Sequence, residues 1–331
     1  MTSRARRSIA RQVVIWALGV VLAVAAAGVA AAGELALITG RQTGTYFRFG
    51  HDLKRLVRPS GIDVVVHPSN GALDNLFAVS RRGGIHLGIV QSDILRFVAD
   101  QHANPSLARI ARNVHTVFPL FSEEVHVLGR RDIGDFEQLA GKRVAIGRVG
   151  SGTYLTARWL FRLADVVPGE MVPLDGADAL AQLKAGQIDA LVYVAAVPIG
   201  MLQRLKTDDG LALIPIMSPR IRETYAAAEI PGDAYAWQRT PVPTVAVKAV
   251  LVSSDLDEQN CALVGRFAQQ VAAGHQWLVQ HGHPAWKQVK FDNPWQEHEC
   301  VRNSGRADSP AAGITEHNPV GDAIKDTVDG N

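Results

Sequence analysis

Apolar and polar positions follow two periods that take turns along the chain. Short apolar runs are typical of buried strands, whereas apolar residues three and four apart predict amphipathic helices. The expected strands cover residues 35–39, 63–67, 86–90, 114–120, 125–129, 143–147, 188–194 and 245–253. The expected helices cover residues 44–58, 71–81, 93–100, 151–163, 177–185, 199–206 and 219–227. This alternation predicts an α/β fold, in which mainly parallel sheets carry helices on both faces.

Two places in this pattern predict a hinge. No helix separates the strands at 114–120 and 125–129, and a second long extended run covers residues 239–255. Two such crossings would join two lobes that open and close about them. A long helix over residues 256–280 would return the chain to the first lobe. The expected organisation is lobe 1 at residues 34–122 and 246–302, lobe 2 at residues 123–245, and a C-terminal tail at residues 303–331.

Residues 1–33 have the pattern of an export signal. Arginines precede an apolar stretch at residues 13–32, and the small residues at 30–33 offer a site for a signal peptidase. The apolar stretch is about 20 residues long, which is enough to span a bilayer. An uncleaved membrane anchor is therefore the alternative to a cleaved signal peptide. In both cases we expect the rest of the chain to lie in the periplasm.

The charge of the chain gives no reason to expect nucleic acid as a partner. The formal net charge is +2, from 34 Lys and Arg against 32 Asp and Glu. Four of the arginines (Arg4, Arg6, Arg7 and Arg11) belong to the export segment, and without them 30 basic residues face the same 32 acidic ones. A balance near −2 lacks the basic excess that nucleic-acid binding requires.

Only two cysteines occur, Cys261 and Cys300. In an oxidising compartment they would close a loop of about 40 residues, a disulfide worth about 4 kcal/mol in chain entropy. Two unpaired thiols are the alternative. Two cysteines are too few for a zinc site built on thiolates, and the scattered histidines suit exposed loops better. We expect no metal and no cofactor.

Two glycine-rich loops carry the candidate binding chemistry. Each follows an expected strand and opens a helix, where free backbone N–H groups and the helix dipole favour an anion. In open α/β sheets ligands bind at the carboxyl ends of the strands, where both loops fall. Plain helix capping is the alternative for either loop. The first loop contains Thr39, Gly40, Arg41, Gly44, Thr45 and Tyr46, and the second contains Arg148, Ser151, Gly152 and Thr153.

Further candidates and exclusions come from the other strand ends. Gln91 and Ser92 follow the strand at 86–90, and Asn70 follows the strand at 63–67. A phosphate-loop lysine after Gly44, a dinucleotide G-x-G-x-x-G and a hydrolase G-x-S-x-G are all missing from the sequence. We therefore expect no enzyme. An exported enzyme with Ser92 or Ser151 as nucleophile, or Asp93 as base, is the alternative.

A series of stretches, in order, resembles the TAXI class of solute receptors from TRAP transporters. The stretches are "ITGRQTGTYF", "NGALDNL", "GIVQSD", "LAGKRVAIGRVGSGTYLTAR", "ALAQLKAGQIDALVYVAAVP" and "VPTVAVKAVLV". The resemblance implies a two-lobed type II periplasmic-binding fold. It also implies a small carboxylate ligand, an amino acid such as glutamate or an organic acid, held between the lobes and passed to a membrane permease. A monomer is expected, and a periplasmic sensor for such a ligand is the alternative.

The same resemblance implies which residues meet the ligand. Arg41 and Arg148 depart from the small residues that the family has there. Either guanidinium could form a bidentate pair with a ligand carboxylate, or it could point to solvent. The resemblance places at the site Thr39, Gly40, Gly44, Thr45, Tyr46, Asn70, Gln91, Ser92, Ser151, Gly152, Thr153 and Tyr193.

Overall fold

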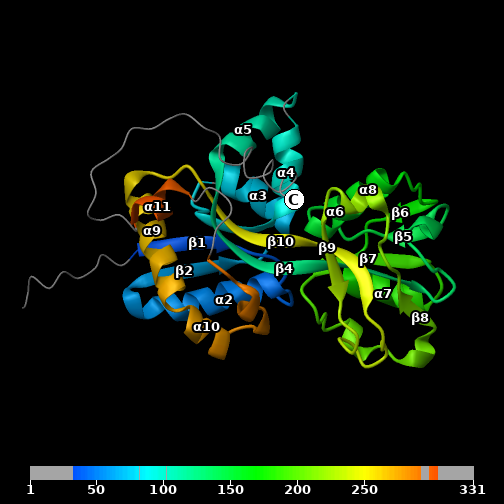
Figure 1. Ribbon diagram of the computed structural model, residues 1–331. Helices are drawn as coiled ribbons and strands as arrows, with labels where there is room; N and C mark the ends of the chain where they lie inside the picture. The colour runs from blue at the N-terminus through cyan, green and yellow to red at the C-terminus, as the bar shows by residue number, and fades with distance from the viewer. Residues whose placement is uncertain (1–32, 82, 102, 292–297, 305–331) are drawn as a thin grey trace, which may run out of the picture. The chain divides into compact units, whose positions relative to one another are not determined.

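One ten-stranded mixed sheet runs through the part of the protein that the structure describes (Figure 1). The structure is a computed structural model, and it describes residues 33–81, 83–101, 103–291 and 298–304. The order of the strands is β2-β1-β3-β10-β4-β7-β5-β6, with β8 beside β4 and β9 beside β10. The strands are β1 (Gly33–Ile38), β2 (Ile62–His67), β3 (Leu87–Gln91), β4 (Val114–Arg130), β5 (Arg143–Ala145), β6 (Glu170–Val172), β7 (Ala190–Ala195), β8 (Leu211–Leu213), β9 (Ala226–Ile230) and β10 (Val242–Ser254).

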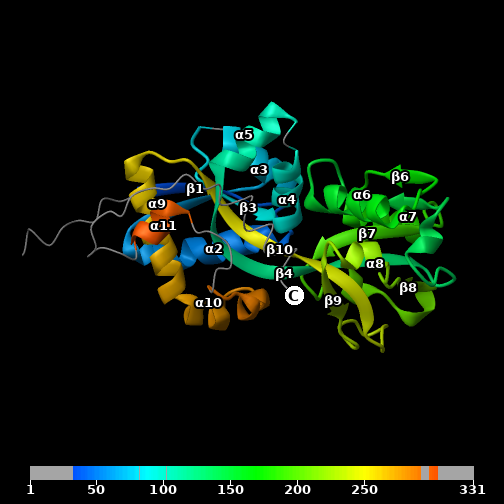
Figure 2. The same cartoon turned by 45° about the horizontal axis from the view of Figure 1, so that its top comes forward.

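The two longest strands, β4 and β10, pass through both lobes. They pair with each other in antiparallel fashion, with Val250 opposite Pro119 and Ala246 opposite Glu124. On the lobe 1 side β3 pairs with β10, and on the lobe 2 side β7 pairs with β4. Figures 1 and 2 show the two strands side by side between the two groups of helices. They are the only covalent path between the lobes in the described residues.

Helices cover both faces of the strands in each lobe. In Figure 1, α3, α4 and α5 lie on one side of the lobe 1 strands, and α2 and α10 lie on the other. The lobe 1 helices are α2 (Thr45–Val57), α3 (Ala72–Arg81), α4 (Ser92–Asp100), α5 (Pro105–Asn113), α9 (Glu258–Ala273), α10 (His275–His281) and α11 (Glu299–Ser304). The lobe 2 helices are α6 (Gly152–Ala164), α7 (Gly176–Lys184) and α8 (Pro219–Arg222).

Helix α2 shows how the sequence sets these elements. Its buried residues include Phe49, Leu53 and Val57, which are four apart and therefore share one face of the helix. The helix begins after Gly44. It ends as an α-helix at Val57, because Pro59 has no backbone N–H to continue the hydrogen bonds of the helix, and the chain tightens into a short 3-10 turn at Arg58–Ser60.

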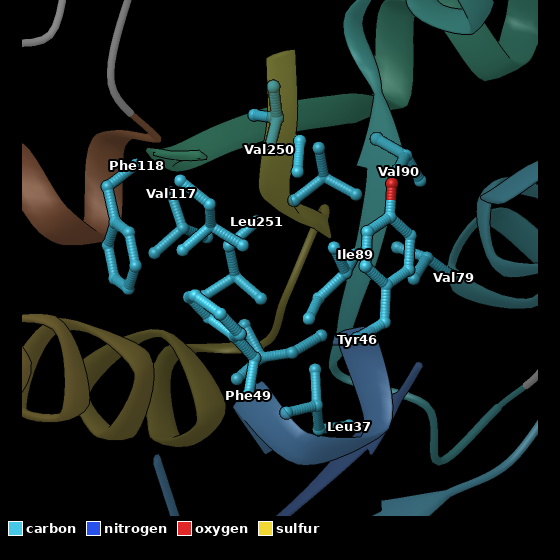
Figure 3. Close-up of a cluster of buried hydrophobic side chains, with 14 of the residues drawn as sticks. Leu37, Tyr46, Phe49, Val79, Ile89, Val90, Val117, Phe118, Val250 and Leu251 are labelled. Atoms are coloured by element: carbon cyan, nitrogen blue, oxygen red, sulfur yellow. The ribbon is translucent and has the colours of Figure 1, made fainter. Parts of the chain in front are cut away.

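Each lobe has its own buried core. In lobe 1 the ring of Phe49 stacks on Trp286 at 4.3 Å between centroids and lies 4.4 Å from that of Phe121. Figure 3 shows the part of this core where Phe49 and Tyr46 of α2 face residues of β3 and β10. In lobe 2 Phe136 stacks on Phe161 at 5.0 Å. The separate cores allow each lobe to keep its packing while the angle between them changes.

Two sequence predictions, for β4 and for the long C-terminal helix, were wrong in detail. The strands expected at 114–120 and 125–129 are one strand, because β10 continues to pair with the backbone through Glu123 and Glu124. The helix expected at 256–280 is broken at Gly274, where a Cβ would overlap the side chain of Leu56 in α2.

The other misplaced elements lie in lobe 2. The helix expected at 219–227 ends at Arg222, and Ala226–Ile230 instead forms β9 by pairing with β10. Of the helix expected at 199–206 only a 3-10 turn at Leu202–Arg204 is present. The β9 segment receives its conformation from β10, and the 3-10 turn accepts a hydrogen bond at the Leu202 carbonyl from the Trp237 indole at 2.7 Å. Local periodicity shows neither contact.

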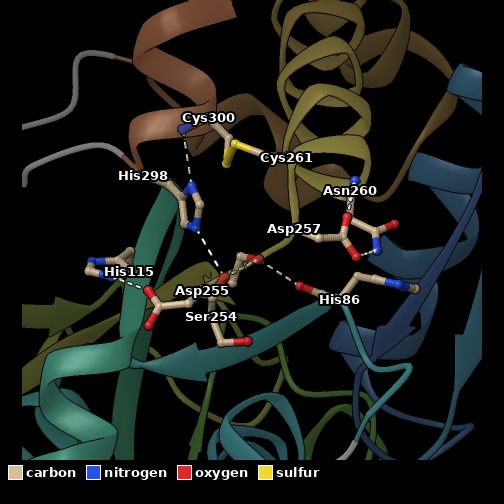
Figure 4. Close-up of a disulfide and its surroundings, with 10 residues drawn as sticks. His86, His115, Ser254, Asp255, Asp257, Asn260, Cys261, His298 and Cys300 are labelled. Atoms are coloured by element: carbon tan, nitrogen blue, oxygen red, sulfur yellow. Dashed lines mark hydrogen bonds and ion pairs between the residues drawn. A yellow bond between two sulfur atoms is a disulfide. The ribbon is translucent and has the colours of Figure 1, made fainter.

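The predicted disulfide is confirmed. Cys261 in α9 and Cys300 in α11 are bonded, which ties the last described helix to lobe 1. Figure 4 shows the bond beside His298, whose side chain accepts from the backbone of Cys300 at 3.2 Å. All of the export segment except Gly33, which begins β1, and most of the predicted tail at 303–331 lie outside the described residues. Among the helices that are described, none has the length and apolar character to cross a membrane.

Candidate functional site

Five helix starts face one another between the lobes. Helices α2, α3 and α4 follow the ends of β1, β2 and β3 in lobe 1, and α6 and α7 follow β5 and β6 in lobe 2. Each start presents backbone N–H groups that have no partner within the helix, together with the positive end of the helix dipole. A negatively charged group between the lobes is therefore favoured by this part of the backbone.

The lobes touch directly at the loops before α3 and α6. The backbone N–H of Asp74 donates to the carbonyl of Gly150 at 3.1 Å. Gly71 has a φ of 136°, and a Cβ on it would lie 3.1 Å from the Cα of Ser151. Gly152 is equally close, because a methyl group there would overlap the amide oxygen of Gln91. Glycine lets backbone approach backbone at Gly71, and lets the backbone at Gly152 lie against the Gln91 side chain.

Asp93 forms a second contact between the lobes. Its Oδ2 accepts from the hydroxyl of Thr156 in α6 at 2.6 Å and from that of Tyr225 at 3.2 Å. Burial raises the pKa of the Asp93 carboxyl, and these hydrogen bonds oppose the rise. Nearby, the rings of Phe97 and Trp159 meet edge to face at 5.7 Å. Because the hydrogen bonds link α4 to lobe 2, they form only when the lobes are together.

The two candidate guanidinium groups also bridge the lobes. Arg41, before α2, forms an ion pair with Asp175, which caps the start of α7. Arg148, before α6, donates from Nη1 to Oδ1 of Asn70 at 3.1 Å. The structure therefore places both arginines at the junction between the lobes, where each is engaged by a residue of the opposite lobe.

Glu123 lies at the centre of a buried polar cluster. Its Oε2 accepts from the hydroxyl of Tyr46 at 2.6 Å and from Nε2 of Gln91 at 3.1 Å. Only 3% of Glu123 is exposed, and burial raises its pKa to about 8 against the pull of both hydrogen bonds, with Asp93 and Glu124 adding to the rise. Burial, followed by the charge of Glu123, raises the pKa of Tyr46 well above its ordinary value. The tyrosine is therefore a hydrogen-bond donor and the acid is mostly neutral at pH 7.

The amide of Gln91 is only half satisfied. Its Nε2 binds Glu123, whereas its Oε1 is buried and has no hydrogen-bond partner among the described residues. A buried acceptor without a donor costs about 1 to 3 kcal/mol. This oxygen lies against Gly152, at the boundary between the lobes.

Thr153 and Tyr193 line the lobe 2 side of the junction. The hydroxyl of Thr153 accepts from the backbone of Val194 at 3.1 Å, which ties the start of α6 to β7. The Tyr193 ring packs on Gly176 at the start of α7, where a Cβ would lie 2.6 Å from it. Burial raises the pKa of Tyr193, and the charge of Glu123 raises it further.

Several predicted site residues shape the loops. Thr39 is buried, and its hydroxyl donates to the carbonyl of His67 at 2.9 Å. Ser92 accepts from the backbone of Lys248 at 3.0 Å, and Ser151 caps α6 by accepting from the Tyr154 backbone at 3.1 Å. The remaining three lie at the start of α2: Gly40, Gly44 as its N-cap and Thr45 as its first residue. These residues hold the helix starts in place.

Sequence reasoning missed three residues at the junction between the lobes: Glu123, Asp175 and Thr156. A signal for Glu123 existed, because two adjacent acids interrupt an otherwise apolar stretch between the expected strands. The sequence prediction left these acids between two expected strands and gave them no role in the site. Asp175 and Thr156 gave no signal, because a capping aspartate and a helical threonine are common on helix surfaces.

The fold places the protein in a known class. Among solved structures, the periplasmic binding protein BugD is similar at a TM-score of 0.52 and 12% identity, over 89% of this chain and 95% of that chain. The predicted α/β class is thus confirmed as the two-lobed type II periplasmic-binding-protein fold. The chain belongs to the NMT1-like family, whose model matches residues 37–264.

Two further solved structures are similar at lower scores. One is the substrate-binding protein of an ABC uptake transporter from Streptococcus pneumoniae with bound histidine, at a TM-score of 0.48 and 14% identity, over 76% of this chain and 92% of that chain. The other is an ancestral arginine-binding protein bound to arginine, at a TM-score of 0.47 and 14% identity, over 77% of this chain and 95% of that chain.

Proposed function

We propose that this chain is an extracytoplasmic solute-binding protein of the TAXI class. It captures a small carboxylate, an amino acid such as glutamate or an organic acid, between its lobes and delivers it to a TRAP-type membrane permease. Membership of the NMT1-like family and the type II fold support the general class. The sequence stretches around both glycine loops support the finer assignment.

The observation that carries the proposal is the set of contacts between the lobes. Asp74 with Gly150, Asp93 with Thr156, and Arg41 with Asp175 each join lobe 1 to lobe 2. All are polar contacts that water would replace if the lobes parted. A ligand that touches both lobes shifts the population toward the closed form by its extra contacts there, which is capture by closure.

The helix starts supply the affinity for a carboxylate. Each start contributes about 0.3 to 2 kcal/mol with an anion, and each charge-assisted hydrogen bond contributes about 1.5 to 3 kcal/mol. Within the described residues no side chain caps α2 at Gly44, so the first-turn amides there are available to a ligand. Several such contacts together reach the roughly 8 kcal/mol of a micromolar complex.

The proposal includes that the chain carries out no chemistry on its ligand. A nucleophile needs a general base within hydrogen-bond reach. The hydroxyl of Ser151 instead donates to the carbonyl of Arg148 at 2.7 Å, and that of Ser92 accepts from a backbone N–H. Oδ2 of Asp93 already accepts from two hydroxyls, whereas its Oδ1 is buried without a partner among the described residues. These commitments favour binding over catalysis, and we propose a monomer that acts with its permease.

The disulfide supports a location outside the cytoplasm. The bond between Cys261 and Cys300 belongs to an oxidising compartment. BugD, which has a similar fold, is a periplasmic binding protein, and this is consistent with the proposed location. The permease partner would meet the closed lobes at the membrane surface.

A ligand screen tests the proposal. Thermal-shift measurements against amino acids, keto acids, dicarboxylates and aromatic acids should find a carboxylate that raises the melting temperature. Mass spectrometry should then recover that compound unchanged after long incubation. If no compound in the panel stabilises the protein, the proposal is wrong. If a compound is recovered chemically altered, the protein is an enzyme.

Two matched glycine variants test whether binding requires closure. In Gly152→Ala the new methyl group meets the amide of Gln91 across the junction, so we expect about 5- to 150-fold weaker binding from overpacking of about 1 to 3 kcal/mol. Gly200→Ala is the control, because a Cβ there has no neighbour within 4 Å among the described residues. Equal affinities for the two variants, measured by calorimetry, would contradict capture between the lobes.

A further inference from the structure

We propose that the carboxyl group of Glu123 binds the ammonium group of the ligand, so that the ligand is an α-amino acid and not a simple organic acid. This inference rests on the proposed function, because it assigns one end of the ligand within the same site. It assigns the choice of ligand to Glu123, an acid on β4, the strand that crosses between the lobes.

The position of Glu123 suits this role. It lies on β4 opposite Val247 of β10, where the two strands pass between the lobes. Its hydrogen-bond partners Tyr46 and Gln91 both come from lobe 1. Lobe 2 closes on this group through Gly152, which lies against the Gln91 amide. A ligand on lobe 1 would therefore meet Glu123 first and be covered by lobe 2 afterwards.

The cluster contains an acceptor that has no donor. Tyr46 and Gln91 both donate to the same oxygen of Glu123, and Oε1 of Gln91 has no partner among the described residues. Gln91 is itself only 3% exposed, so water is largely excluded from it. An ammonium group carries three N–H donors and no acceptor. It is the ligand group that would satisfy Glu123 and Gln91 together.

The charges around the cluster also favour a cation. Asp93 and Glu124 both act on Glu123 as negative neighbours. The nearby protein cations are engaged elsewhere, since Arg41 pairs with Asp175 and Lys248 donates from Nζ to the Ser122 hydroxyl at 3.0 Å. A buried carboxylate becomes stable as an ion only when a cation accompanies it. The ligand ammonium would be that cation.

Helix α2 carries both a donor to Glu123 and an uncapped start. Tyr46, the donor to Glu123, is the second residue of α2, whose first-turn amides carry no side-chain cap at Gly44. Those amides favour a ligand carboxylate, while Glu123 would accept from an ammonium group. An α-amino acid carries both groups, whereas a simple organic acid carries only the first.

The test compares pairs of compounds that differ only in the ammonium group. Calorimetric titration of the full chain would use the common L-amino acids and their counterparts without the amino group, for example L-glutamate against glutarate. We expect the best amino acid to bind at least about 30-fold more tightly than its counterpart, which is about 2 kcal/mol at 1.4 kcal/mol per tenfold. Glu123→Gln should remove most of that difference while leaving the affinity for the counterpart within about threefold.

Control variants separate the inference from the proposed function. Tyr46→Phe removes one donor to Glu123 and should weaken amino-acid binding less than Glu123→Gln does. Glu229→Gln, on the exposed face of β9, should change neither affinity. Equal affinity of the natural protein for glutamate and glutarate, or equal losses for both in Glu123→Gln, would overturn the ammonium site and leave a carboxylate receptor standing. Binding of no acid at all would overturn both.

Discussion

The difference in stability between Glu123→Gln and the natural protein should grow as the pH rises from 5 to 8. In the folded protein the pKa of Glu123 is raised from an ordinary 4.5 to about 8. In the unfolded chain the side chain ionises near its ordinary pKa. Between these two values the folded state binds more protons than the unfolded state, so folding stability falls as pH rises. The loss is absent below the ordinary pKa and complete above about pH 8.

The size of the effect follows from the same two values. Each pH unit between them costs about 1.4 kcal/mol, so Glu123 lowers the free energy of unfolding by about 1 kcal/mol at pH 5 and about 4 kcal/mol at pH 8. Glutamine keeps the shape, still accepts from the Tyr46 hydroxyl and does not titrate. Glu123→Gln should therefore gain about 3 kcal/mol of stability over the natural protein between pH 5 and pH 8.

Guanidinium unfolding at several pH values measures this gain. The natural chain, Glu123→Gln and the exposed control Glu229→Gln would be compared from pH 5 to pH 9 without ligand. The control should follow the natural protein at every pH. A Glu123→Gln stability difference that stays constant over this range would refute a buried, mostly neutral acid at this position, whatever its absolute size.

Three further predictions concern the contacts between the lobes and the disulfide. Arg41→Ala should weaken ligand binding by up to about fivefold, because the side chain of Arg41 is 44% exposed and its salt bridge to Asp175 is worth no more than about 1 kcal/mol. The control Arg143→Ala breaks the pair with Glu170 within lobe 2 and should not change the affinity measured by calorimetry. Thr156→Val removes one of the two hydroxyl donors to Asp93 and should weaken closure-dependent ligand binding about tenfold. The melting temperature measured without ligand should change little. Replacing both cysteines of the bond between α9 and α11 by serine should lower the free energy of unfolding by about 2 to 4 kcal/mol, and equal stability of the reduced and oxidised natural protein would contradict this.

Local pattern predicted most of the fold. The helix expected at 44–58 is Thr45–Val57, and the one expected at 151–163 is Gly152–Ala164, because each has a clear apolar face and a recognisable start. The failures lie where a distant strand decides. Ala226–Ile230 has no pattern of its own and becomes β9 only because β10 pairs with it. Pairing between residues far apart in sequence is not visible in one segment.

The candidate site was predictable in place but not in chemistry. The loops at Gly40 and Gly152 lie at the strand ends where they were expected, since glycine and helix starts mark such loops. The partners across the junction were not visible, because the ion pair of Arg41 with Asp175 joins residues from two lobes. Glu123 lay between two expected strands and was given no role, so the cluster around it was not anticipated.

These two kinds of residue separate affinity from specificity. The amides at the helix starts are backbone groups, which any protein with five such starts offers to any anion of suitable size. Glu123 is a side chain whose charge state depends on what lies beside it, because burial keeps it mostly neutral until a cation arrives. The backbone can therefore hold a carboxylate in general, whereas the choice between an amino acid and an organic acid falls to the one buried acid on β4.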